Sequence, residues 1–171
     1  GAVLFPHNFG LGAAGNPELM RGIGRATAEQ VIATGIDWTF APTVAVAMDY
    51  QWGRSYESYG QNPDMVRDYA YEMVAAIQGG ENDDRFGDGH IIATIKHFVG
   101  DGGTAEGIDQ GETTLSEQAL FDVHAQGYVG GLTAGAQTVM ASFNSWNGDK
   151  LHGHHYMLTT VLKERMGFDG F

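Results

Sequence analysis

Arg54, Lys96 and His97 are the side chains of this sequence best suited to chemistry on a polar ligand. Lys96 and His97 stand side by side directly after the apolar run 91–95, and a glycine-rich turn follows them. Charged groups make the stronger hydrogen bonds to hydroxyls. An indole such as that of Trp146 offers a flat apolar surface for the C–H face of a sugar ring. If the fold brings these residues together, they predict a carbohydrate pocket.

The predicted elements indicate how these residues could meet. Strands and helices alternate, which is typical of an α/β protein with parallel strands joined by right-handed crossovers. Asn16 and Pro17 mark the start of one helix, and Thr114 to Glu117 resembles a capping box. Helices are expected over 17–34, 63–78, from 114 onward and over 157–166, and strands over 38–42, 91–95 and 136–141, with a last strand beginning at Phe168.

The long loops 43–62, 97–114 and 142–156 all follow the carboxyl ends of predicted strands. Enzymes built on TIM-type barrels place their sites on loops at that edge. The pattern therefore resembles that of a TIM-like (β/α)8 barrel, an arrangement that would place Arg54, Lys96, His97 and Trp146 on one rim.

Each candidate also has a purely structural interpretation. Arg54 could pair with Glu57 or Asp49 to hold its own loop, and Lys96 could extend to solvent. Trp38, Trp52 and Trp146 could belong to the core. The acidic residues Glu81, Asp83, Asp84 and Asp88 are interpreted as a solvated loop, because their spacing does not match a calcium-binding loop.

Two motifs are interpreted as coincidental. Gly10, Gly12 and Gly15 match the spacing of a dinucleotide-binding loop, but the predicted helix starts after the glycines and Gly35 occupies the position expected for an acid. His152, His154 and His155 could bind zinc, yet they lie in a loop without a suitably spaced carboxylate. We therefore expect no cofactor and no metal, and a metal-dependent hydrolase is a distant alternative.

Composition and charge exclude several further classes of protein. The 171 residues carry a net charge of −12, which argues against nucleic acid as a partner. No apolar run approaches the roughly 20 residues of a membrane span. Without cysteine, thiol and disulfide chemistry are excluded. The chain starts without methionine and reads as the inside of a longer protein.

Several segments together resemble the N-terminal barrel domain of glycoside hydrolase family 3, the β-glucosidase and glucan glucohydrolase family. They occur in family order across residues 1–171, which we interpret as a partial barrel domain. The matching segments are LFPHN at 4–8, FAP at 40–42, WGRSYESY at 52–59, KHFVGDGGT at 96–104, VMASFNSWNG at 139–148 and GFDGF at 167–171.

The resemblance implies an exo-acting β-glucosidase that retains the anomeric configuration, with an Asp nucleophile and a second carboxylic acid. It implies that Arg54, Lys96 and His97 bind sugar hydroxyls, and Met140 and Trp146 are expected as further substrate contacts. The nucleophile is expected just after Phe171, so no catalytic residue is expected within the chain, and the chain alone is expected to be inactive. Asp169 precedes the position of the nucleophile, and Phe143 stands where relatives often have tyrosine.

The resemblance also implies a β-glucoside or glucan substrate and a periplasmic or secreted enzyme. Two further expectations remain. The alternative function is a non-catalytic carbohydrate-binding protein on a barrel-derived fold. An unclosed barrel would expose two sheet edges, so self-association through those edges is expected.

Overall fold

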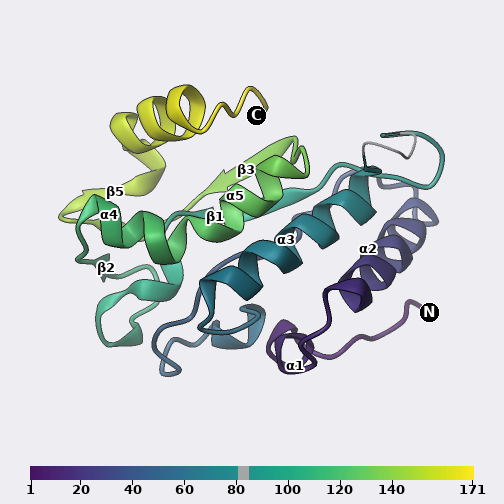
Figure 1. The fold of residues 1–171 in the computed structure, drawn as a ribbon, viewed down its shortest axis with the longest axis horizontal. Helices are drawn as coiled ribbons and strands as arrows, with labels where there is room; N and C mark the ends of the chain where they lie inside the picture. The colour runs from purple at the N-terminus through teal and green to yellow at the C-terminus, as the bar shows by residue number, and fades with distance from the viewer. Residues whose placement is uncertain (81–84) are drawn as a thin grey trace.

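The computed structural model describes residues 1–80 and 85–171, which form a mixed α/β structure with helices packed along one face of a small parallel sheet (Figure 1). The predicted alternation of strands and helices is confirmed. The helical elements are α1 (Asn8–Ala13), α2 (Pro17–Ile32), η1 (Ser55–Glu57), α3 (Pro63–Gln78), η2 (Asp101–Gly103), η3 (Ala105–Gly107), α4 (Glu117–Ala119), η4 (Leu120–His124), α5 (Gln126–Thr133), η5 (Leu151–Gly153) and η6 (Tyr156–Arg165).

Helix starts follow the capping signals. The Asn16 side chain accepts a hydrogen bond from the Leu19 N–H at the start of α2, and Pro17 occupies the first turn. At the start of α3, Asn62 caps in the same way. The prediction of a helix starting from Thr114 is wrong: the cap is Ser116, which accepts from Ala119 N–H. Pairing of the short strand β2 (Glu112–Thr113) with a neighbouring strand keeps the preceding backbone extended and delays the helix.

The central sheet is parallel, as predicted. Strand β1 (Thr94–Phe98) pairs with β3 (Thr138–Ala141), and single bridges join Trp38 to Ile92 and Thr43 to Lys96. On the other side of β3, Phe171 N–H donates to the Gln137 carbonyl. Four parallel chain segments therefore lie side by side, and they form no closed barrel within the described residues.

The predicted strand bounds need correction. β1 runs from Thr94 to Phe98 rather than over 91–95, so Lys96 and His97 lie within the strand and not after it. Of the first residues of the apolar run, Ile92 makes only an isolated bridge to Trp38. Residues 38–42 make only an isolated bridge, and Pro42 has no N–H to offer a ladder. At the chain's end, Phe171 rather than Phe168 makes the pairing contact with β3.

A second, three-stranded sheet was not predicted. In it β4 (Ser145–Trp146) pairs in parallel with β2 and antiparallel with β5 (Asp149–Lys150). The hairpin between β4 and β5 turns at Asn147 and Gly148, whose φ angles are 49° and 98°. Asn-Gly is a strong signal for such a turn, because both positions need positive φ.

The two faces of the central sheet differ. On one face α3 packs against both α2 and α5 (Figure 1), and the Phe98 ring meets Tyr128 of α5 edge to face at 4.9 Å. On the other face the Trp38 indole N–H donates to Thr94 Oγ1 at 2.8 Å. Trp38 also contacts Phe40 and Phe171, whose side chains are 54% and 76% exposed. The helix face therefore forms the core, while the opposite face carries exposed aromatic rings.

Within the described part of the chain, no helix is both long enough and apolar enough to cross a membrane.

Candidate functional site

Five charged or titratable side chains meet at the carboxyl end of β1, and we call them the strand-end cluster: Arg54, Glu57, Lys96, His97 and Asp101. Arg54 Nε and Nη2 donate to the two carboxylate oxygens of Glu57 at 2.8 and 2.9 Å. Arg54 Nη2 lies 3.4 Å from His97 Nε2, and His97 Nδ1 lies 2.8 Å from Asp101 Oδ2. The fold therefore brings Arg54 and His97 together, as predicted, and Lys96 lies near enough to Glu57 and Arg54 for their charges to interact.

The loop that follows residues 38–44 carries the first pair of the cluster, Arg54 and Glu57. A single 3₁₀ turn, η1, sets Arg54 and Glu57 three residues apart, so that their side chains share one side. Thr43 Oγ1 lies 3.3 Å from Glu57 Oε2, and Asn8 Nδ2 donates to the Glu57 carbonyl at 2.7 Å. The Arg54–Glu57 pair is thus tied to the sheet and to α1, and the pairing considered as a structural alternative is also part of the site.

An irregularity in strand β1 accompanies the placement of the second pair, Lys96 and His97. Lys96 is opposite Met140 of β3 and Phe98 is opposite Ala141, so His97 has no partner across the ladder. The Lys96–His97 and Phe98–Val99 peptide bonds are cis. In a regular strand neighbouring side chains point to opposite faces, and a register break of this kind re-aims a side chain. The break accompanies the placement of both Lys96 and His97 toward the Arg54–Glu57 pair.

The cluster is electrostatically coupled. The hydrogen bonds from Arg54 to Glu57 hold the pKa of the Glu57 carboxyl below its ordinary value. The same bonds raise the pKa of Arg54. Burial lowers the pKa of the Lys96 ammonium, and the negative charge of Glu57 opposes that effect. Glu57 therefore stabilises two cations that would otherwise repel each other at one strand end.

A cavity of about 290 Å³ opens beside the cluster. Lys96, Glu57 and Thr43 bring donors and acceptors to its wall, and Tyr56 and Phe40 bring aromatic rings. Hydroxyl groups need both a donor and an acceptor. The wall therefore has the chemistry that a polyhydroxylated ligand requires.

Met140 and Trp146, the other predicted substrate contacts, lie outside the strand-end cluster. Met140 is half-buried opposite Lys96, whereas Trp146 lies in the second sheet, where its indole N–H donates to the Leu115 carbonyl. Trp52 is buried and donates to Asp109 Oδ1, so it belongs to the loop's own core. Phe143 is 59% exposed and stacks on His152. Substrate contact by Met140 and Trp146 stays a prediction.

Two residues of the cluster, Glu57 and Asp101, are not among the site residues predicted from the sequence. The sequence suggests Glu57 only as a partner that holds the Arg54 loop, and Asp101 only as one of the polar residues on the rim. Their spacing offered a signal, since Glu57 follows Arg54 by three residues and Asp101 follows His97 by four. Thr43 and Asn8, which hold Glu57, come from distant segments and left no local signal.

The two coincidental motifs have structural explanations. Gly10 and Gly12 lie inside α1, and a Cβ at Gly12 would fall 1.7 Å from the Tyr59 carbonyl oxygen. His152 stacks on Phe143, and His154 Nδ1 accepts from the Met157 N–H. Within residues 1–80 and 85–171, no group of three or more His, Asp or Glu side chains is arranged to hold a metal. In the predicted acidic loop, Glu81, Asp83 and Asp84 lie outside the described residues.

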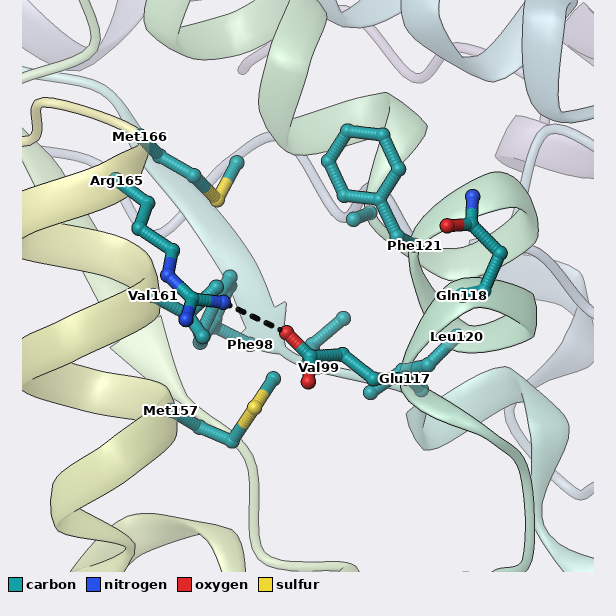
Figure 2. Close-up of a pocket in the computed structure, with 11 residues that line it drawn as sticks. Phe98, Val99, Glu117, Gln118, Leu120, Phe121, Met157, Val161, Arg165 and Met166 are labelled. Carbon is teal, nitrogen blue, oxygen red and sulfur yellow. Dashed lines mark hydrogen bonds and ion pairs between the residues drawn. The ribbon is translucent and has the colours of Figure 1, made fainter.

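A second cavity, of about 470 Å³, lies in the helix layer between η4 and η6 (Figure 2). Its floor is apolar, with Phe98, Val99 and Leu120. Glu117 and Arg165 form an ion pair of 3.0 Å between its two walls. This cavity is separate from the strand-end cluster, and its two charged side chains, Glu117 and Arg165, are paired with each other.

We expect the Glu117–Arg165 pair to contribute little stability. The two side chains are 46% and 57% exposed, and exposed pairs typically contribute less than about 1 kcal/mol. Arg165→Met keeps the apolar stem and removes the charge. Its unfolding free energy, measured in urea, should fall by less than about 1 kcal/mol. A loss above about 2 kcal/mol would show that the pair organises the cavity wall.

Fold and cluster together define a class: a mixed α/β protein with a polar site at the carboxyl ends of parallel strands, the location typical of α/β enzymes. The chain belongs to glycosyl hydrolase family 3, whose N-terminal domain matches residues 1–171.

Named relatives support the assignment. The chain is 32% identical to a periplasmic β-glucosidase of Salmonella typhimurium over 98% of its length, and 31% identical to a β-xylosidase of Formosa agariphila over 99%. The crystal structure of an exo-1,3/1,4-β-glucanase from a Pseudoalteromonas species matches all of the chain with a TM-score of 0.98 and 57% identity. The chain spans 22%, 24% and 21% of these three proteins, respectively.

Proposed function

We propose that this chain forms about half of a (β/α)8 barrel, as a partial N-terminal domain, and supplies the sugar-binding part of a retaining, exo-acting β-glucosidase active site. The substrate would be a β-glucoside or glucan with a terminal, non-reducing glucosyl residue. Arg54, Lys96 and His97 would bind its hydroxyl groups, with Met140 and Trp146 as further contacts. The observation that carries the proposal is the strand-end cluster, at the edge where barrel enzymes bind their substrates.

The mechanism gives these residues a supporting role. In a retaining glycosidase, positive charge develops at the anomeric carbon while a carboxylate attacks it. Hydrogen bonds to ring hydroxyls that strengthen in that transition state lower the barrier. The attacking carboxylate is expected just after Phe171 and the acid elsewhere in the protein, so we expect no turnover by residues 1–171 alone.

Names of relatives support the substrate class and the compartment. A Listeria innocua β-glucosidase has been solved with laminaribiose and with glucose, and its structures are 28% identical to this chain. Two relatives are described as periplasmic and one as lysosomal. From the periplasmic relatives we infer that this protein is also periplasmic or secreted.

The first test is a calorimetric titration of the chain with glucose and gluconolactone. The variant Lys96→Ala/His97→Ala should lose at least about tenfold in affinity, because it removes two hydrogen-bonding groups. The matched control is Lys163→Ala/His155→Ala, which removes one lysine and one histidine at exposed positions. Equal binding by both double variants would contradict the site.

A second test separates the enzyme from a non-catalytic binding protein. The full-length protein carrying this chain should hydrolyse an aryl β-glucoside, and faster than the matching β-xyloside. Preference for the xyloside would replace the glucosyl assignment, since one relative is a β-xylosidase. Sugar binding without any hydrolysis would favour the non-catalytic alternative.

A further inference from the structure

The contact between His97 and Asp101 is nearly enclosed. The two side chains are 14% and 10% exposed, and His97 Nδ1 lies 2.8 Å from Asp101 Oδ2. Asp101 belongs to η2, which is tied to a neighbouring loop by the hydrogen bond from Met48 N–H to the Gly102 carbonyl at 2.9 Å. This hydrogen bond holds in place the turn that carries the Asp101 carboxylate beside the imidazole.

The two neighbours of His97 together define its tautomer. A guanidinium can only donate hydrogen bonds, so His97 Nε2 must accept in its 3.4 Å contact with Arg54 Nη2. A carboxylate can only accept, so His97 Nδ1 must carry the proton that it donates to Asp101. Both constraints select the same neutral form, with the proton on Nδ1.

Charge balance around the ring agrees with this form. Arg54 and Lys96 are cationic, and Glu57 and Asp101 are anionic, so the strand-end cluster is neutral when His97 is neutral. A proton on Nε2 would place a donor against a donor of Arg54 at 3.4 Å.

We propose that Asp101 is a positioning residue that holds His97 as the Nδ1–H tautomer, so that the lone pair of Nε2, which faces Arg54 Nη2 at 3.4 Å in this structure, can accept instead from a sugar hydroxyl that displaces this contact. The neighbouring Lys96 ammonium can only donate. A hydroxyl shared between them would donate its proton to His97 Nε2 and accept from Lys96 Nζ. The pair would thus select a hydroxyl over a carbonyl or ether oxygen, which lacks the proton. This second step rests on the proposed function, whereas the tautomer does not.

Nitrogen NMR of the chain, labelled with ¹⁵N in its histidine rings and recorded at neutral pH, tests the tautomer directly. The His97 signals, assigned by their loss in His97→Ala, should show a protonated Nδ1 and an unprotonated Nε2. Asp101→Asn keeps an acceptor oxygen and should keep this pattern. Asp101→Leu fills the space without an acceptor and should give the Nε2–H form or a mixture, because the 3.4 Å contact with Arg54 is too long to hold the tautomer by itself. A wild-type Nε2–H signal, or an unchanged pattern in Asp101→Leu, would overturn the proposal.

Kinetics in the full-length protein test the consequence. Asp101→Leu should lower kcat/KM for an aryl β-glucoside at least about tenfold, a loss of the size found when the hydrogen-bonded partner of a metal-ligating histidine is removed. Asp101→Asn should recover most of that loss.

The matched control is Asp109→Asn. The charge of Asp109 acts on Arg54 as that of Asp101 does, but Asp109 accepts from Trp52 and not from His97. This variant should stay within about threefold of wild type. If kcat/KM of Asp109→Asn falls as far as that of Asp101→Leu, the loss of negative charge rather than the orientation of His97 explains the effect, and the proposal fails. A wild-type protein with no hydrolysis would instead contradict the proposed function, leaving the NMR result as the test of the tautomer.

Discussion

Replacing Gln78 with leucine is expected to lower the free energy of unfolding by about 3–5 kcal/mol. Gln78 is fully buried at the end of α3. Its Oε1 accepts from the backbone N–H groups of Ala93 and Gln137, at 3.1 and 3.2 Å, and its Nε2 donates to the Gly135 carbonyl at 2.8 Å. Leucine would leave the two N–H groups without these bonds and the Gly135 carbonyl with only its 3.3 Å bond from Gln137 Nε2, and each unpaired buried group costs about 1–3 kcal/mol.

The loss matters because Gln78 joins α3 to the residues just before β1 and β3. A typical domain has a stability of only about 5–15 kcal/mol, so the variant should unfold at clearly lower urea concentration. Gln137→Leu is the matched control, since its side chain is only half-buried and donates to the same Gly135 carbonyl at a longer 3.3 Å. That variant should lose about 1 kcal/mol or less. Similar losses of unfolding free energy in the two variants would contradict the prediction that the buried hydrogen bonds of Gln78 stabilise the fold more than those of Gln137.

Acidification from about pH 6.5 to about pH 4 should cost the fold on the order of 3 kcal/mol through His124 alone. His124 is 3% exposed. Burial lowers its pKa to about 4, although the negative charge of Asp101 opposes the shift. The unfolded chain takes up a proton near pH 6.5, while the folded protein does so only near pH 4. Stability from this residue is thus complete above pH 6.5 and is lost as the pH falls toward 4.

Urea unfolding at several pH values between 4 and 8 measures this dependence. His124→Gln, which cannot titrate, should have a shallower slope over that interval, whatever its stability at pH 8. His155→Gln, which removes an exposed imidazole, serves as the control and should keep the wild-type slope. Parallel curves for wild type and His124→Gln would contradict the assignment.

Both residues bear on the proposed site. Gln78 anchors the starts of the two strands that carry Lys96 and Met140. His124 lies close enough to Asp101 to experience its charge. The stability of the framework and the geometry of the strand-end cluster should therefore be altered together by mutations at either position.

Local features of the sequence determined where most elements lie. Asn16 with Pro17, and Pro63 after Asn62, mark helix starts because capping depends on neighbours within three residues. Apolar runs identified the buried parallel strands, although not their bounds, because burial extends beyond strand pairing. The Asn147–Gly148 hairpin could also have been predicted from its turn chemistry.

Residue types and their positions also indicate which side chains could serve a sugar site, since Arg54, Lys96 and His97 follow predicted strands. How these side chains are arranged depends on contacts between distant segments of the fold. The tertiary structure brought Arg54 to His97 across 43 positions of sequence, made Glu57 the shared counter-ion, and placed Trp146 in a separate sheet. The tautomer of His97 was likewise decided by two partners on different loops. A hydrogen bond forms only when donor and acceptor lie within about 3 Å. Partners in this cluster such as Arg54 and His97 are far apart in the sequence, so local patterns do not reveal their distances.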